Sequence, residues 1–310
     1  MLGNNRKSVS TREDSMEKKR TKKVFRVISI IIAAGLILFV GFTIASHAVY
    51  HRSDMATVVE IYFRMSGTKD IFADEEKCME YIEQRSRAAE YSLTEKRAYI
   101  NDASSYHWKF CDKLAQRVNA EVIFPIYPLT PNHTWEETFD LLAVLYQELM
   151  KNADGPVIIM GDSAGGGLAV AFCEYISGLG LEQPDKMILF SPWMDISMSN
   201  PDAAGYEDAD PMLSAYGLIE MGRYWAGDID LTDYRVSPIY GDISSLRNVY
   251  LFVGTREIFY PDVVKFYVML NGEAVKTELY IGEGMNHVYP LYPIPEADEA
   301  MEQICKILEE

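Results

Sequence analysis

The sequence predicts an α/β fold in which a mostly parallel sheet is flanked by helices. Two observations support this prediction. From residue 104 onward, short apolar runs alternate with longer segments of helical periodicity, a pattern that favours parallel strands with helices on both faces. The chain also has 310 residues, of which 48% are hydrophobic and 24% are charged. This is an ordinary globular composition, with enough length for one large domain and an appendage.

The first 49 residues differ in composition from the rest. Residues 1–26 contain nine Lys or Arg and three acidic residues, and the uncharged run Val27–Ser46 follows. About 20 apolar residues suffice for a helix to cross the hydrocarbon core of a membrane. We therefore predict a basic cytoplasmic tail over residues 1–23 and a transmembrane helix over residues 24–49. The alternative is a cleaved signal peptide, for which Ala45-Ser46-His47-Ala48 is a weak cleavage site.

The predicted orientation follows from the basic cluster that precedes the uncharged run. Positive side chains stay on the cytoplasmic side, so we expect a single-pass protein of the cell membrane whose remaining residues face outward. Residues 27–310 hold 20 basic and 43 acidic side chains, a net charge of −23. Such an acidic surface argues against a nucleic-acid partner.

The four cysteines are far apart in the sequence, at positions 78, 111, 173 and 305. They lack the close spacing of zinc sites and of small disulfide-bonded domains, so we expect four buried or half-buried thiols. No cluster of residues has the spacing of metal ligands, and we expect no cofactor.

The sequence predicts the remaining elements as follows. Residues 50–98 form a cap or linker region, in which Asp74–Tyr91 is helical. Thr57–Phe63 is compatible with a strand, with a continuation of the membrane helix or with part of the cap. Residues 99–310 form the α/β domain. Its predicted strands are Glu121–Tyr127, Val157–Met160, Lys186–Phe190, Val249–Val253 and Glu278–Ile281, and its predicted helices are Trp108–Val118, Trp135–Met150, Leu168–Ser177, Val263–Leu270 and Ala297–Leu308.

Residues 194–247 interrupt the alternation with loops and one helix near Gly217–Trp225. We interpret them as a cap insertion above the carboxyl edge of the sheet, where open α/β sheets bind their ligands.

A G-x-S-x-G motif, Gly161 to Gly165, lies between a predicted strand and a predicted helix. This context is typical of a strained turn that presents a nucleophilic serine, here Ser163. The amide of Ala164, at the start of the following helix, is a candidate oxyanion donor. Glycine-rich turns of this kind also bind phosphate, so the motif alone is not decisive.

A serine hydroxyl needs a histidine to take its proton and a carboxylate to orient that histidine. Only His287 follows Ser163, and it lies in the loop after the last predicted strand. Two acids follow the preceding strand. We favour Glu257 as the third member, with Asp262 as the alternative acid, because Asp262 is also a natural N-cap for the helix after it.

From about Tyr99 to the end, roughly two thirds of the chain, the sequence resembles the hormone-sensitive-lipase-like esterases of the α/β-hydrolase superfamily. The resemblance rests on Gly161–Gly166, Tyr127–Pro131, Ser191–Trp193, Ser237–Pro238 and Gly254–Asp262. It implies hydrolysis of carboxylic esters through an acyl-enzyme, with Ser163 as nucleophile, His287 as base and Glu257 as the acid, where the family usually has aspartate. It also implies an ester or lipid-like substrate held beneath a cap.

One departure from the family concerns the His-Gly-Gly element, whose backbone supplies most of the family's oxyanion hole. The matching positions here are Glu95-Lys96-Arg97, without glycine, and the first strands of the usual sheet are missing from the sequence. Losing one oxyanion donor costs about a hundred- to a thousandfold in rate. We predict an ester hydrolase impaired at this element. The alternative is a membrane-tethered, non-catalytic pseudo-hydrolase that binds a ligand.

Overall fold

The computed structural model describes residues 31–32, 34–92 and 104–310. Two compact units divide the chain, Met1–Asp54 and Met55–Glu310. The predicted basic tail, the beginning of the predicted membrane helix and the Glu95-Lys96-Arg97 element lie outside the described residues.

In the first unit, the described residues form one helix, Ala34–Val49, whose last turn is the π-helix η1 (Ala45–Val49). Its large apolar side chains are exposed, from Val40 at 54% to Leu38 at 74%. Within the described part of the chain, no single helix is long and apolar enough to cross a membrane. One bent pair, Ala34–Val49 with Asp54–Ser66, meets the length and composition requirement together.

The second unit is built on a four-stranded parallel sheet in the order β1-β2-β3-β4. The strands are β1 (Ile158–Asp162), β2 (Lys186–Phe190), β3 (Val249–Gly254) and β4 (Thr277–Gly282). All three neighbouring pairs are parallel, so all four carboxyl ends meet at one edge of the sheet. The predicted parallel sheet with flanking helices is confirmed.

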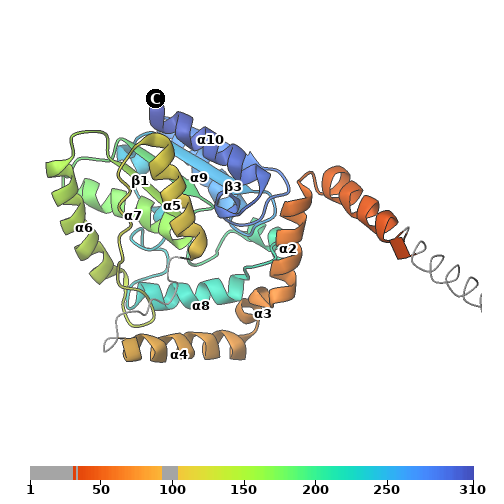
Figure 1. The fold of residues 1–310 in the computed structure, drawn as a ribbon. Helices are drawn as coiled ribbons and strands as arrows, with labels where there is room; N and C mark the ends of the chain where they lie inside the picture. Colours follow the sequence, from red (N-terminus) through yellow and green to blue (C-terminus); the bar gives the residue numbers. More distant parts are fainter. Residues whose placement is uncertain (1–30, 33, 93–103) are drawn as a thin grey trace, which may run out of the picture. The chain divides into compact units, whose positions relative to one another are not determined.

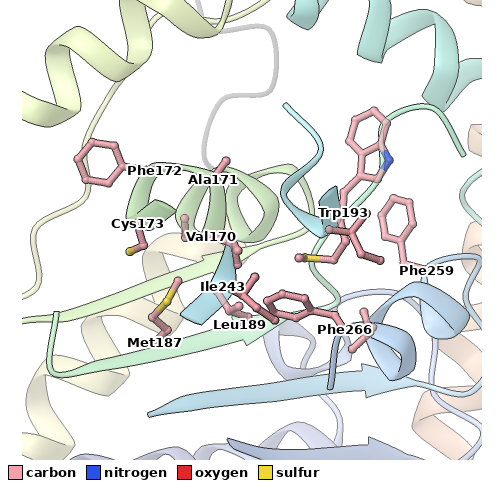
Figure 2. Packing of buried hydrophobic residues seen from close by; sticks show 14 of the residues in the cluster. Val170, Ala171, Phe172, Cys173, Met187, Leu189, Trp193, Ile243, Phe259 and Phe266 are labelled. Atoms are coloured by element: carbon pink, nitrogen blue, oxygen red, sulfur yellow. The ribbon is translucent and has the colours of Figure 1, made fainter. Parts of the chain in front are cut away.

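The side chains of the two central strands alternate between two apolar clusters, one on each face of the sheet. Met187 and Leu189 of β2 belong to the cluster that includes helix α7, and Figure 2 shows both on this face near Val170. Ile188 and Phe190 point to the opposite cluster. All four are less than 4% exposed, because a parallel strand covered by helices on both faces buries every residue.

The helices of the second unit agree closely with the predicted ones. One face of the sheet carries residues of α6 (Trp135–Asn152), α7 (Ala164–Gly178) and α9 (Tyr260–Gly272), and the other carries α5 (Ser105–Val118) and α10 (Pro295–Glu309) (Figure 1). Helix α7 begins at Ala164, four residues before its predicted start, because the glycine-rich turn itself continues as helix. The four thiols are free and buried or half-buried, as predicted.

The predicted strand Glu121–Tyr127 is wrong, because this segment has no regular secondary structure. Its apolar side chains stay partly exposed, from Val122 at 37% to Ile126 at 52%. A strand exists only as part of a hydrogen-bonded ladder, and β1 is the edge of the sheet in the described part of the chain. The segment has the composition of a strand but pairs with none of the described strands.

The segment after Asp54 is helical throughout its described part, forming α2 (Asp54–Ser66), α3 (Thr68–Ala73) and α4 (Glu75–Ser92). Thr57–Phe63, whose structure the sequence left open, therefore belongs to a helix. Helices α3 and α4 contact α8 (Ala215–Ala226), the main helix of residues 194–247 (Figure 1). A Cβ atom on Gly217 would lie 2.7 Å from Phe72, so α8 approaches α3 at a glycine.

Candidate active site

Ser163 occupies the turn between β1 and α7 in a strained backbone conformation. Its φ is +52° and its ψ is −121°, a region that costs a non-glycine residue about 1–3 kcal/mol. The Ser163 amide donates to the carbonyl of Phe190, and the Ser163 carbonyl accepts from Trp193. These bonds to the end of β2 and the loop after it fix the turn, so the hydroxyl projects at the carboxyl edge of the sheet.

Two glycines, the first of the motif and one just after it, are required by close approaches around this turn. A Cβ atom on Gly161 would lie 2.4 Å from the carbonyl oxygen of Gly165, and one on Gly167 would lie 2.1 Å from that of Trp193. Both distances are far below van der Waals contact. The sequence spacing is therefore the spacing that a sharp strand-to-helix turn needs.

His287 links Ser163 to Glu257 by two hydrogen bonds. Its Nε2 lies 2.9 Å from the Ser163 Oγ, and its Nδ1 lies 2.6 Å from Glu257 Oε2. A carboxylate accepts only, so Nδ1 carries the proton and Nε2 is the acceptor that faces the serine. His287 and Glu257 are 3% and 0% exposed, so bulk water does not compete for the bond between them.

The Glu257 carboxylate is held from a second side. Its Oε1 accepts from the Ser191 hydroxyl at 2.7 Å and from the Gly254 amide at 2.6 Å. The Ser191 hydroxyl oxygen in turn accepts from the Val288 amide at 3.0 Å. Loops that follow β2, β3 and β4 therefore meet at this one carboxylate.

The loop that carries Glu257 is also tied directly to the loop that carries His287. The amide of Thr255 donates to Gly282, and that of Arg256 donates to Met285, each at 3.0 Å. A Cβ atom on Gly254 would lie 2.3 Å from the Met285 carbonyl oxygen. Only glycine permits this approach, which sets the separation between acid and histidine.

Asp262 does not contact His287. It lies in the first turn of α9, where its Oδ1 accepts from Asn200 at 2.7 Å. Burial raises its pKa, and the hydrogen bond from Asn200 opposes that rise. Of the two candidate acids, the structure therefore brings Glu257 to the histidine and leaves Asp262 in a separate contact.

The net electrostatic effect on His287 favours its protonated form. Burial by itself lowers the pKa of this imidazole, but the hydrogen bond and charge of Glu257 outweigh it. The carboxylates of Asp210 and Asp162 add to the effect, and the pKa is raised above its usual value. The imidazolium that forms when a serine gives up its proton is thus stabilised.

Two further side chains lie beside the nucleophile turn. His107 Nδ1 accepts from the Ser104 amide at 2.9 Å, capping α5, and its Nε2 lies 3.2 Å from Asp162 Oδ2. The Tyr127 hydroxyl lies 3.9 Å from the position of a Cβ atom on Gly165. Burial, aided by the charge of Asp162, raises the pKa of Tyr127 to about 12, so the phenol stays a hydrogen-bond donor at neutral pH.

Sequence patterns left both side chains without a specific role beside the nucleophile. His107 precedes Ser163 in the chain, outside the order expected for a base, and Tyr127 enters the sequence argument only through a predicted strand and the family resemblance. The position of His107 near the start of a helix can be read from the sequence. The sequence spacing does not show that His107 and Tyr127 lie close to the Ser163 turn.

The predicted oxyanion donor, Ala164, is the first residue of α7 and is exposed. The first amides of a helix have no acceptor within the helix, so this position offers a free donor beside Ser163. Among the residues that the structure describes, no group of three or more His, Cys, Asp or Glu side chains is arranged to hold a metal ion.

The family comparison agrees with this geometry. Residues 98–291 match the family model described as the alpha/beta hydrolase fold. The chain belongs to the α/β-hydrolase family. The hydrolase resembles an esterase of Acinetobacter venetianus with 29% identity, over 67% of this chain and 71% of the relative. It also resembles a triacylglycerol lipase of Mycobacterium tuberculosis with 29% identity, over 52% of this chain and 32% of the relative.

Solved structures of esterases and lipases also resemble the hydrolase. A Staphylococcus aureus protein assigned as an esterase matches with a TM-score of 0.65 and 35% identity, over 67% of this chain and 71% of that one. A hormone-sensitive lipase from a metagenome library matches with a TM-score of 0.60 and 29% identity, over 63% and 68%. The chain is thus a carboxylesterase-like hydrolase by family.

Proposed function

We propose that this hydrolase cleaves carboxylic esters through an acyl-enzyme, with Ser163 as nucleophile, His287 as general base and Glu257 as the acid that orients it. The observation that carries the proposal is the chain of two hydrogen bonds, at 2.9 and 2.6 Å, from the serine hydroxyl to the glutamate. The esterase and lipase relatives support the substrate class, which is an ester or a lipid.

In the first half of the reaction, His287 Nε2 takes the hydroxyl proton as Ser163 Oγ attacks the ester carbonyl carbon. Glu257 stabilises the imidazolium that forms. Collapse of the tetrahedral intermediate breaks the bond to the alkoxide, which leaves with the proton from His287. Water then repeats these steps on the acyl-enzyme and releases the acid, so each ester consumes one water and returns the free serine.

The tetrahedral oxyanion needs donors, and the Ala164 amide is the first that we assign. We propose the Tyr127 hydroxyl as a second, because it is a protonated donor at neutral pH and lies beside the same helix turn. A side-chain hydroxyl there would offset part of the loss of glycine amides at residues 95–97. Two preorganised donors each contribute on the order of a hundredfold in rate.

The protein is further proposed to be tethered to the cell membrane by its N-terminal helix, with residues after 50 outside the cytoplasm. Support comes from the uncharged run Val27–Ser46 after the basic cluster and from the exposed apolar side chains of Ala34–Val49. Carbonate extraction of cell membranes tests the tether. Recovery in the membrane pellet is the expected result, and release into the supernatant would contradict the proposal.

Hydrolysis of p-nitrophenyl esters tests the assigned roles. Ser163→Ala should abolish turnover, and Glu257→Gln should lower kcat by about 10⁴, because it removes the charge that fixes the histidine tautomer. Asp262→Asn is the matched control and should keep kcat within about threefold. If Asp262→Asn were as damaging as Glu257→Gln, the assignment of the acid would be wrong. A folded parent protein that binds esters without cleaving them would favour the non-catalytic alternative.

A further inference from the structure

Charged side chains on α2 and α3 support the loop that carries Glu257, although both helices lie outside the residues that match the family. Glu60 of α2 contacts this loop directly, and Lys69 of α3 contacts the loop Glu207–Asp210, which is bonded to it. We infer that α2 and α3 form a clamp on this loop, with Glu60, Arg64 and Lys69 as positioning residues for the catalytic acid. The inference rests on the proposed role of Glu257. It assigns a role in catalysis to α2 and α3, which the family match does not contain.

The first arm of the clamp is a partly buried ion pair between Glu60 of α2 and Arg256, the residue before Glu257. The Arg256 Nε and one Nη donate to the two carboxylate oxygens of Glu60, at 3.1 and 3.0 Å. Arg64 Nε donates to Glu60 at 2.7 Å. The Glu60 residue is only 5% exposed. A bidentate pair of this kind fixes direction as well as distance.

The second arm holds the residue after Glu257 through a loop of the cap insertion. Lys69 Nζ donates to the carbonyl oxygens of Asp210, at 3.0 Å, and Glu207. Arg64 donates to the carbonyl of Ala209 at 3.1 Å. The wholly buried carboxylate of Asp210 then accepts from the Ile258 amide at 3.0 Å.

The second arm is fixed at its base as well, because the other Asp210 oxygen accepts from the amides of Met212 and Leu213, at 2.8 and 2.9 Å. The carboxylate therefore bridges the cap insertion and the acid loop.

The two arms grip the residues on either side of Glu257. The glutamate itself has no exposed surface, and its Oε2 must stay within hydrogen-bond distance of His287. A shift of about 1 Å in a catalytic group costs on the order of a hundredfold in rate. Anchoring both neighbours to α2 and α3 restricts that shift. One set of contacts reaches the acid loop at Arg256, and the other reaches it at Ile258 through Asp210.

The test compares Glu60→Gln in the full-length protein with Asp70→Asn, which removes an exposed carboxylate from α3. Glu60→Gln should lower kcat by about 10- to 100-fold while KM changes by less than about threefold. The acid limb of the pH profile should also move to lower pH. His287 faces the carboxylates of Glu257, Asp210 and Asp162, and weakening the first of these contacts removes part of what holds its proton. Asp70→Asn should leave all three measurements unchanged.

A double-variant cycle separates positioning from stability. In a Glu257→Gln background, Glu60→Gln should have almost no further effect on kcat. The clamp is refuted if Glu60→Gln lowers only the melting temperature, or if it lowers kcat equally in both backgrounds.

A proton NMR measurement separates failure of the clamp from failure of the proposed function. The proton shared between His287 Nδ1 and Glu257 should give a low-field signal that is lost in His287→Gln. Glu60→Gln should shift or broaden that signal even if the parent enzyme hydrolyses no ester tested. An unchanged signal would overturn the clamp, whereas absence of Ser163-dependent turnover would overturn only the proposed function.

Discussion

Glu174 of α7 makes a prediction about stability that does not depend on catalysis. Its carboxyl group is 6% exposed and packs against Gly241, where a Cβ atom would lie 1.7 Å from Oε2. Among the described residues, neither carboxylate oxygen has a hydrogen-bond partner. Burial, with a smaller contribution from Asp242, raises the pKa from 4.5 to about 9. Glu174 is therefore neutral in the folded protein at pH 7 and ionised in the unfolded chain.

The size of the effect follows from this difference in pKa. One pKa unit corresponds to about 1.4 kcal/mol, so at pH 7 the buried carboxyl costs the folded state about 3 kcal/mol relative to a group that stays neutral. The folded protein binds one more proton at Glu174 than the unfolded chain does, so its stability falls as the pH rises. The contribution is zero below the unfolded pKa, becomes more unfavourable by about 1.4 kcal/mol per pH unit as pH rises, and levels off above the folded pKa.

Glu174→Gln removes this pH dependence while keeping the side-chain shape. We expect the free energy of unfolding of the variant, minus that of the parent, to rise by about 1.4 kcal/mol per unit between pH 5 and pH 8. Burying an amide adds a constant offset that does not change this slope. Urea titrations of both proteins in mild detergent at several pH values measure it.

The control for this experiment is Glu182→Gln, which removes an exposed carboxylate after α7. A difference between Glu174→Gln and the parent that stays constant across pH would refute the reasoning, because it would mean that Glu174 is ionised in the folded state.

Three other predictions concern the active site. The kcat/KM for a p-nitrophenyl ester should fall on the acid side of its pH profile with an apparent pKa above 6.5, since His287 must be neutral to accept a proton and its pKa is raised. An apparent pKa below 6.5 would contradict the raised pKa of His287. Gly254→Ala should lower kcat by at least about a hundredfold, because its Cβ forces the acid and histidine loops apart; Gly272→Ala, with open space at its Cβ, is the control and should have little effect on kcat. Tyr127→Phe should lower kcat by about 10- to 100-fold with little change in KM, and an unchanged kcat would exclude the hydroxyl as an oxyanion donor.

Strands β1 to β4 and their helices could be predicted from sequence because the pattern of apolar residues within each segment indicates its structure. Buried apolar runs such as Lys186–Phe190 and the helical periodicity of Trp135–Asn152 do not depend on distant residues. The failure at Glu121–Tyr127 has the opposite cause. Its composition is that of a strand, but a strand forms only when another strand pairs with it. None of the described strands pairs with this segment.

The candidate site could be predicted in part for a similar reason. The motif around Ser163 and the position of His287 after the last strand restrict the chemistry to a few residues. The preference for Glu257 over Asp262 depends on which carboxylate turns toward the histidine, and in the structure Glu257 does, held by Ser191 and Gly254. The clamp from Glu60 to Arg256 joins residues 196 positions apart, so no local pattern could have indicated it.

The central claim, that Ser163 is an activated nucleophile, is tested most directly with a fluorophosphonate probe followed by mapping of the labelled peptide. Glu257→Gln and Ser163→Ala serve as the matched variants. We predict that the parent is labelled at Ser163, that Ser163→Ala is not labelled, and that Glu257→Gln is labelled far more slowly. A folded parent that stays unlabelled, or that is labelled at another residue, would contradict the account.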